Sequence, residues 1–349
     1  MSAVSKLNYR YNMTIKAFPS HAEPVFESGS QQDLVWGARW GCDSDVGRLR
    51  KVLVHRPGDE MNIINPAKRL DHLGSYGDAE GETWYWRGDE IVPLAVQQAQ
   101  HDALTAALTA EGVEVLPLAR CAPGRHKSIY TRDSCIAVKG GAIVTRLGPK
   151  VRRGEEAPVT ETLAAAGMPI LRTIHGHGLM EGGSFVWLNA ETAVIGRSSR
   201  VNEEGARQVE EVLRAQGVSL LRVDLAGYRL HIDAALVMIG VDTAIVNPTQ
   251  LPFWFLETLA EMKIRTVEVH PDDHSGAVNC LAIGGPIDEN DEAAVQAKVK
   301  EIEEGMHAIS AKLYEAAAAE MAEQEEAGAA PSDDGVVDAD FEVVDEDEN

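Results

Sequence analysis

Three short segments place an acidic or imidazole side chain just before an apolar run. They read YTRDSC at residues 130–135, MEGGSF at 180–185 and LHIDAA at 230–235. The side chains in question are those of Asp133, Glu181, His231 and Asp233. Paired carboxylates suit a planar cation with several N–H donors, such as a guanidinium. An imidazole beside carboxylates suits acid–base chemistry.

Each of these residues also has an ordinary structural explanation when it is taken alone. An aspartate after an arginine can end a turn or form a salt bridge, and a histidine in a strand is more often a hydrogen-bonded core residue. Their recurrence at the same place in successive repeats favours a shared site. Gly182 and Gly183 would let the backbone approach a ligand closely.

The repeats consist of a leucine-rich helical pattern, a stop and a β-branched run. The copies lie at residues 104–118, 161–174, 210–225 and 256–269. Glycine stands where a helix end favours a left-handed residue in the first three copies, at Gly112, Gly167 and Gly217. The fourth copy has Met262 at this place, so the stops are 55, 50 and 45 residues apart.

Pairs of apolar runs with a turn between them precede the last three helices. The turns are expected at Gly140-Gly141, around Asn189 and near Gly240. Units of strands plus a helix predict an α/β fold, either a closed array or a plain doubly wound sheet. In a closed array equivalent strand starts converge on the axis, which would bring the four polar residues to one cavity.

Charge and cysteine content bear on partners and location. The net charge is −23, of which residues 288–349 supply −18 through 21 Asp/Glu and 3 Lys. This balance argues against nucleic acid and anionic membrane as partners. We find no apolar segment typical of an export signal or membrane span. Four cysteines without CxxC spacing predict a reduced cytoplasmic protein, without a metal site or a cofactor.

The motifs together resemble the guanidino-group-modifying superfamily, which includes arginine deiminases, dimethylarginine dimethylaminohydrolases and amidinotransferases. The resemblance covers about residues 46–283 and rests on the order and spacing of TRDS, MEGGSF, GRSSRVNEEG and LHIDAALVMI. The segments HDALTAALTAEGVEVLPL and VRRGEE also resemble it. It implies a pentein-type α/β propeller of five ββαβ repeats around a central site.

The resemblance also implies roles for the polar residues. Asp133 and Asp233 would grip a guanidinium, and Glu181 would orient His231. His231 would protonate the leaving amine and later activate water. The chemistry of this superfamily also needs a cysteine thiolate, which attacks the guanidinium carbon and forms a covalent thiouronium.

Other positions are candidates with open alternatives. Arg153 and Arg200 are candidates for binding the substrate carboxylate, although arginines also form surface ion pairs. EGGS departs from the commoner EGGD, which leaves the role of Ser184 open. Cys135 is a remote candidate for the nucleophile and is more simply explained as a buried strand cysteine.

Cys280 is the main candidate for the nucleophile, yet its register speaks against that role. The segment 272–283, DDHSGAVNCLAI, resembles the first strand of the superfamily's fifth repeat, whereas the nucleophile lies on the last strand. By this register the fifth blade is incomplete, and Cys280 is a strand cysteine beside the site.

The pattern changes after residue 287. Apolar residues alternate at spacings of four and three from Val295 to Leu313, which predicts a long amphipathic helix. A disordered acidic tail is expected from Gly328. Residues 288–349 resemble the last lid helix and acidic C-terminus of DnaK-type heat-shock chaperones. We expect an N-terminal extension, a propeller, a C-terminal helix and a tail at residues 1–45, 46–287, 288–327 and 328–349.

The sequence supports three hypotheses about function. The first is hydrolysis of a small guanidino substrate, arginine or a methylated arginine, through a covalent cysteine intermediate. The second is an amidinotransferase, which passes the amidino group to an amine. The third is a scaffold that binds guanidinium without catalysis, because the nucleophile strand is missing. Association into a homo-oligomer and a chaperone-type partner for the tail are left open.

Overall fold

The computed structural model describes residues 8–19, 29–78, 83–226, 229–270 and 276–284. All of them belong to one compact unit that spans residues 1–294. The predicted C-terminal helix and acidic tail lie outside the described residues, so these predictions and the resemblance to DnaK-type chaperones stay predictions. Among the described residues, no helix is long and apolar enough to cross a membrane.

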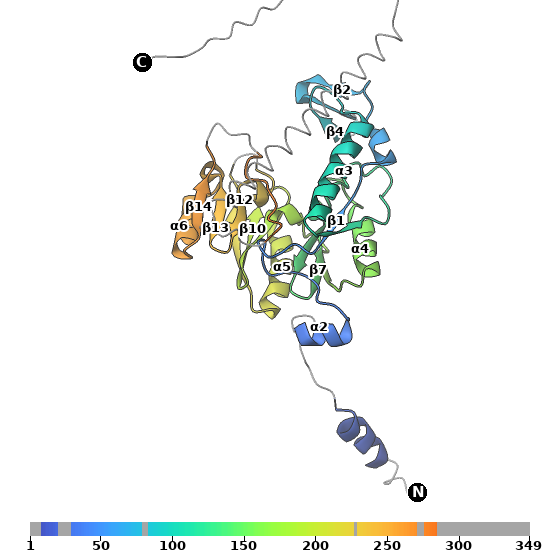
Figure 1. Cartoon of the computed structure of the whole chain (residues 1–349), viewed down its shortest axis with the longest axis vertical. Coiled ribbons are helices and arrows are strands. Elements are labelled where there is room, and N and C mark those ends of the chain that lie inside the picture. The colour runs from blue at the N-terminus through green and yellow to red at the C-terminus, as the bar shows by residue number, and fades with distance from the viewer. Residues whose placement is uncertain (1–7, 20–28, 79–82, 227–228, 271–275, 285–349) are drawn as a thin grey trace, which may run out of the picture. The chain divides into compact units, whose positions relative to one another are not determined.

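Three consecutive units share the order strand, strand, helix, strand (Figure 1). The first contains β6 (Cys135–Val138), β7 (Gly141–Val144), α4 (Glu156–Ala165) and β8 (Ile170–Thr173). The second contains β9 (Phe185–Asn189), β10 (Thr192–Arg197), α5 (Glu203–Ala215) and β11 (Ser219–Asp224). The third contains β12 (Leu236–Gly240), β13 (Thr243–Val246), α6 (Phe253–Glu261) and β14 (Arg265–Glu268). In each unit the middle strand pairs antiparallel with the first strand and parallel with the last.

The N-terminal part of the fold departs from this order. Strands β1 (Lys51–Val54) and β5 (Glu114–Pro117) form a two-stranded parallel sheet, with α3 (Leu94–Ala110) as the crossover. A separate antiparallel sheet of β2 (Arg69–Leu70), β3 (Ser75–Asp78) and β4 (Thr83–Arg87) is inserted before α3. The sequence did not predict this sheet. Upstream of β1, the structure has a π-helix (Asn12–Ala17) and α2 (Gly29–Val35).

The helix stops follow the sequence pattern, with one correction. Gly112, Gly167 and Gly217 have positive φ angles of 77°, 89° and 73°, which glycine adopts without steric cost. In the fourth copy the left-handed residue is Lys263, with φ 60°, so the prediction of Met262 for this place was wrong by one residue. The local pattern of leucines located the helix end, but it did not resolve its last position.

Strand β9 is buried on both faces and joins two parts of the core. Val186 and Leu188 pack in a cluster with residues of the third unit, such as Ile232 and Leu236. Phe185 and Trp187 point to the opposite face and pack against β10 and α5. Successive side chains of a strand alternate between its faces, so an unbroken apolar run is the pattern of a strand with no solvent face.

The segment 276–284 contacts the residues just before β1. The backbone N–H of Leu49 donates a hydrogen bond of 3.0 Å to the carbonyl of Ile283. Val278 is buried, and Ala282 packs against the cluster that contains Val46 and Ile232. Residues 234 positions apart in the chain thus lie side by side, and the segment lies next to the residues that lead into β1.

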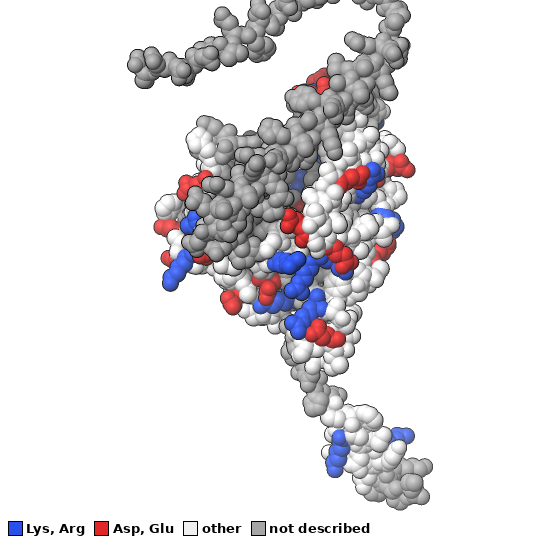
Figure 2. Space-filling view, in the orientation of Figure 1, with Lys and Arg blue, Asp and Glu red and all other residues white. Residues whose placement is uncertain are grey.

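The charged side chains of the described residues are of mixed sign. On the face shown in Figure 2, Lys and Arg are interspersed with Asp and Glu. Arg197, for example, pairs with both Asp224 and Glu203. Exposed pairs of this kind each contribute about 0.2–1 kcal/mol and are screened by salt. A functional site is therefore expected among the buried charges.

Candidate active site

Three 3-10 helices position the candidate residues at the starts of β6, β9 and β12. They span Thr131–Ser134, Gly182–Ser184 and Ile232–Ala234. The first helix contains Asp133, Glu181 directly precedes the second, and His231 and Asp233 flank the start of the third. The second helix contacts both of the others. The structure therefore brings the equivalent positions of the three units together.

Gly183 lies at the centre of this group. A Cβ atom at position 183 would lie 2.9 Å from Asp133 Oδ1, 2.9 Å from His231 Nδ1 and 3.0 Å from Asp233 Oδ2. Two carboxylates and an imidazole thus surround one point beside the Gly183 backbone. Any side chain at this position would fill the space between them, so the glycine keeps the space open. Its own N–H donates to Asp133 Oδ1 at 3.2 Å.

Glu181 holds the imidazole ring. Its side chain is 1% exposed, and its Oε2 lies 2.7 Å from His231 Nε2. Its other oxygen accepts a hydrogen bond of 3.0 Å from the Gly148 N–H. Burial acts to lower the pKa of His231, but the hydrogen bond to Glu181 and the charges of Asp133, Glu181 and Asp233 outweigh it and raise that pKa. His231 Nδ1 is left facing the space beside Gly183.

Arg152 is a buried partner of Asp133 that the sequence did not reveal. Its Nη1 lies 2.7 Å from Asp133 Oδ2 and 3.8 Å from Glu181 Oε2. Its Nη2 pairs with Glu155 Oε2 at 2.8 Å. Burial raises the pKa of Glu155 to about 7, although Arg152 acts to lower it. VRRGEE offers the same spacing of three residues to Arg152 with Glu155 and to Arg153 with Glu156, so the sequence carried no signal that singles out Arg152.

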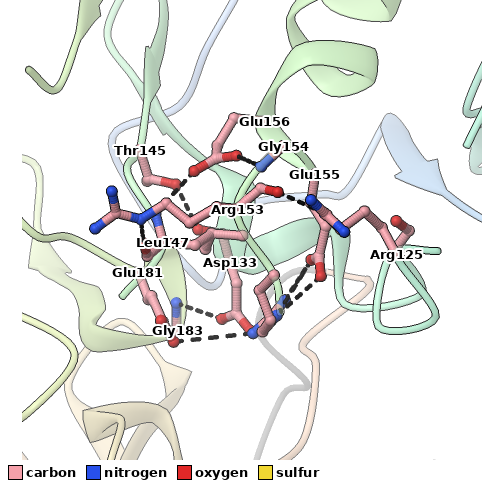
Figure 3. A network of polar contacts seen from close by, with 12 residues as sticks. Arg125, Asp133, Thr145, Leu147, Arg153, Gly154, Glu155, Glu156, Glu181 and Gly183 are labelled. Atoms are coloured by element: carbon pink, nitrogen blue, oxygen red, sulfur yellow. Dashed lines mark hydrogen bonds and ion pairs between the residues drawn. The ribbon is translucent and has the colours of Figure 1, made fainter. Parts of the chain in front are cut away.

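The neighbouring residue Arg153 turns away from the carboxylates. Its Nε donates a hydrogen bond of 2.6 Å to the Leu147 carbonyl (Figure 3). The second predicted arginine, Arg200, lies at the edge of the site, with its Nε 3.8 Å from Glu181 Oε1. A quarter of its side chain is exposed. Of the two predicted arginines, the structure therefore brings Arg200 close to Glu181, while Arg153 binds the backbone of the loop before α4.

Asp233 has a different partner. Its Oδ2 lies 3.3 Å from Nε of Arg132, which also donates to the Phe185 carbonyl at 3.0 Å. Burial raises the pKa of Asp233, against the lowering effect of the Arg132 charge. Arg132 is about half exposed. Each candidate guanidinium-binding carboxylate thus has an arginine of the protein beside it, Arg152 for Asp133 and Arg132 for Asp233.

The cysteines differ in access. Burial raises the pKa of Cys135 to about 11, so this residue is a neutral thiol inside the first unit. Cys280 is exposed, in the segment 276–284. Partial burial raises the pKa of its thiol as well. Two positions further on, Ala282 packs against the cluster of Ile232, which lies between His231 and Asp233.

Ser184 is fully buried and serves the backbone. Its hydroxyl donates a hydrogen bond of 3.3 Å to the Leu230 carbonyl, at the residue before His231. A serine at this position can therefore steady the strand start that carries the imidazole.

The same residues offer ligand atoms to a metal ion. Asp133, Glu181 and His231 each have one such atom within 4.8 Å of the other two. Arg152 already places a guanidinium 2.7 Å from Asp133, and its positive charge opposes a second cation there. The charges of this cluster suit a protein or substrate guanidinium better than a metal ion.

Solved structures show what class of protein has this fold. A cysteine-to-serine variant of DDAH from Pseudomonas aeruginosa, complexed with citrulline, aligns with a TM-score of 0.50 at 23% identity. The alignment covers 68% of this chain and 82% of that chain. The N-terminal domain of ArgZ, an arginine dihydrolase from cyanobacteria, aligns with a TM-score of 0.51 at 15% identity, over 66% and 79% of the two chains. The chain therefore shares its fold with DDAH and with the N-terminal domain of ArgZ.

Sequence comparison narrows the class to a family. Residues 84–263 match the family model described as N,N dimethylarginine dimethylhydrolase, eukaryotic, and the chain belongs to this family. An uncharacterised protein of Bacillus subtilis, YkgA, is 24% identical over 244 residues, which are 70% of this chain and 78% of YkgA. The dimethylarginine dimethylaminohydrolase of Streptomyces coelicolor is 28% identical over 171 residues, 48% of this chain and 64% of that enzyme.

Proposed function

We propose that this protein hydrolyses the guanidino group of a small substrate, arginine or a methylated arginine, through a covalent cysteine intermediate. The observation that carries the proposal is the arrangement of Asp133, His231 and Asp233 around Gly183. The names of the relatives, which include dimethylarginine dimethylaminohydrolases and arginine deiminases, agree with it.

In this proposal, Asp133 and Asp233 bind the substrate cation. A guanidinium placed beside Gly183 would donate N–H groups to Asp133 Oδ1 and Asp233 Oδ2. Both carboxylates are largely buried, and charge-assisted hydrogen bonds are stronger where water is excluded. Arg152 pairs with the other oxygen of Asp133 at 2.7 Å, which leaves Oδ1 facing the space beside Gly183.

Proton transfer falls to His231. Glu181 accepts the Nε2 proton and fixes the ring, so Nδ1 is the nitrogen that exchanges protons with the substrate. The raised pKa of His231 favours its protonated form, which a general acid for the leaving amine requires. After it has given up this proton, the same nitrogen can accept one from the attacking water.

Cys280 supplies the nucleophile in this proposal. Its thiolate attacks the guanidinium carbon, the C–N bond breaks, and ammonia or an alkylamine leaves with the proton from His231. Water then attacks the thiouronium carbon, the C–S bond breaks, and a ureido product leaves. The raised pKa of the free thiol means that the bound cation must favour the thiolate.

The contact between Leu49 and Ile283 supports this role for Cys280. Within the part of the chain that the structure describes, the unit of β1, α3 and β5 has no strand that corresponds to the first strand of the other units. The segment 276–284 lies next to the entry to β1, so it can take that place without a further unit. Ala282, two residues after Cys280, packs against the cluster of Ile232, which brings this segment to the core beside the site.

Arg200 is the proposed contact for the substrate carboxylate. Arg200 lies beside Glu181 at the edge of the site and is partly exposed. Arg153, in contrast, donates a hydrogen bond to the Leu147 carbonyl. Arginine binds carboxylates with two parallel hydrogen bonds.

The test is turnover by the full-length protein and by its Cys280→Ser variant. Arginine, N-monomethylarginine and asymmetric dimethylarginine would be supplied, with ureido product and released amine measured together. The proposal expects equal amounts of both products, and their loss in the variant. Turnover that survives the substitution would overturn the role of Cys280.

Two other results would select the alternatives. Transfer of the amidino group to added glycine, without ureido product, would indicate an amidinotransferase. Absence of any turnover, together with a melting temperature raised by arginine, would indicate a binding scaffold.

A further inference from the structure

A second group of metal-ligating side chains lies outside the candidate active site. We propose that His55, Glu60 and Cys121 form a binding site for a thiophilic divalent cation, with Zn²⁺ as the first candidate. Each of the three offers one ligand atom within 4.8 Å of the other two. None of them belongs to the proposed catalytic group around Gly183.

The parallel sheet of β1 and β5 brings these residues together. Val54 at the end of β1 pairs with Pro117 at the end of β5. His55 directly follows the first of these strands, and Cys121 lies four residues after the second. Glu60 lies in the short 3-10 helix Asp59–Ile63, in the loop that leaves β1. The carboxyl ends of parallel strands share one edge of the sheet, so residues 66 positions apart become neighbours.

The imidazole and the carboxylate are held in place before any ion binds. His55 Nε2 lies 2.9 Å from Glu60 Oε1, and the two side chains are 11% and 7% exposed. The same carboxylate oxygen accepts a hydrogen bond of 2.7 Å from the Gly58 N–H. Supporting hydrogen bonds of this kind orient ligands and are a regular feature of metal sites.

The set of donors matches a borderline-soft cation. A thiolate, an imidazole and a carboxylate together suit Zn²⁺, with bonds of about 2.0–2.3 Å. Their two negative charges balance a divalent ion, and the thiol proton is released to water when the Zn–S bond forms. The Ser128 hydroxyl lies 3.3 Å from Cys121 Sγ, close enough to hold a water molecule in the fourth position.

His101 on α3 is a second observation at this place. Both its ring nitrogens are buried without a hydrogen-bond partner among the described residues. Its Nδ1 is 3.9 Å from Asp102 Oδ1, which is beyond hydrogen-bond reach. Asp102 forms a bidentate pair with Arg56, the residue after His55, so His101 lies on the stretch of α3 that faces this loop. Ordered water would give these nitrogens a partner, so the surroundings of His101 are suited to a polar ligand.

The competing explanation is a hydrogen-bonded cluster without an ion. In that case His55 and Glu60 are only a buried pair, and the Cys121 thiol only donates to nearby oxygens such as the Arg125 carbonyl. The two explanations differ in whether sulfur bonds to an added metal. They also differ in whether the metal stabilises the sheet of β1 and β5.

The test uses Co²⁺ as a spectroscopic probe on the full-length protein after removal of metal by a chelator. The proposal expects near-ultraviolet absorption from thiolate-to-cobalt charge transfer, together with visible bands of a tetrahedral ion. Both should saturate at one equivalent and disappear when Zn²⁺ is added. They should be absent in Cys121→Ser and retained in Cys280→Ser, the matched control whose cysteine belongs to the proposed active site.

Glu60→Gln gives a second readout that keeps the shape of the site. It should weaken Co²⁺ binding by about 10-fold or more, while the metal-free melting temperature of Cys121→Ser shows whether that variant folds. The proposal fails if no sulfur charge-transfer band forms with the wild-type chain. It fails equally if the band persists in Cys121→Ser and disappears in Cys280→Ser, since the metal would then lie at the active site.

Discussion

The three ββαβ units and the segment 276–284 contribute to the candidate active site in different ways. The units supply Asp133, Glu181 and His231, which are joined to one another and to Arg152 by buried polar contacts. The segment supplies an exposed cysteine and joins the fold through the contact of Ile283 with Leu49. In the proposed mechanism, the first region binds and protonates the substrate, and the second carries the reacting atom. Binding and chemistry should therefore be separable by mutation.

The sharpest test of this separation is Cys280→Ser. We expect turnover to fall by on the order of 10³-fold or more, since a hydroxyl in place of the thiolate removes covalent catalysis. The melting temperature and its rise with arginine should stay close to wild type, because the carboxylates are unchanged. Cys121→Ser is the control and should keep full turnover. Loss of arginine binding in Cys280→Ser would show that the segment 276–284 also takes part in substrate binding.

Glu181→Gln tests the opposite region. The amide keeps the size of the side chain but removes the negative charge that helps to raise the pKa of His231. We expect kcat to fall by about 10²–10⁴-fold, which is the range for positioned acid–base groups. The pH profile should also shift to lower pH, in line with a lower pKa of His231. A lower kcat with an unchanged pH profile would mean that Glu181 acts only through packing.

Asp233→Asn tests which substrate the two aspartates Asp133 and Asp233 prefer. With Asp133 and Asp233 on either side of Gly183, a guanidinium with N–H groups on both terminal nitrogens satisfies both carboxylates. A dimethylated nitrogen has no N–H to donate. We therefore expect wild-type kcat/KM to favour arginine over asymmetric dimethylarginine by about 10–100-fold, as an unsatisfied buried charge costs about 1–3 kcal/mol.

The substitution should lower kcat/KM for arginine and narrow that ratio. Asp224→Asn, in the exposed pair with Arg197, is the matched control and should change neither value. A wild-type preference for the dimethylated substrate would contradict this assignment of Asp233.

The smallest expected effect is on stability as a function of pH. The pKa of His231 is raised in the folded protein, so its contribution to stability is fully present below about pH 6.5, the value for a free histidine. It is lost as pH rises through the raised value. Urea unfolding of wild type should therefore give a free energy of unfolding that declines as the pH rises above about 6.5, and that of His231→Gln should decline less.

Glu155 also makes the stability depend on pH, so its effect must be separated from that of His231. Burial raises the pKa of Glu155 to about 7. Its contribution to folding stability therefore also declines as the pH rises, and it is largely lost near neutral pH. Because wild type and His231→Gln both keep Glu155, the difference between their slopes is assigned to His231. Equal slopes in the two proteins above about pH 6.5 would mean that the pKa of His231 is not raised in the folded state.

Local patterns predicted the repeated units well. The turns expected at Gly140-Gly141, near Asn189 and near Gly240 separate the paired strands of the three units. These features depend on residues close in the chain, where turn preferences and strand periodicity act directly. The predicted place of Asp133, Glu181 and His231 at strand starts followed from the repeat, and the structure brings them together.

The structure decided what depends on distant residues. Nothing local distinguishes Arg152 from Arg153, and only the fold turns the first towards Asp133 and the second towards the Leu147 carbonyl. The sheet β2-β3-β4 is made of strands as short as two residues, too short for a periodic signal.

The sequence by itself determined the α/β units, their helix stops and the kinds of side chain available to bind a guanidinium. The tertiary structure decided which of these side chains meet, and it placed the segment of Cys280 beside the entry to β1. The physical reason is that a contact between Leu49 and Ile283 closes a loop through most of the chain. Its stability comes from burial of Val278 and Ala282 in an assembled core, which no short stretch of sequence encodes.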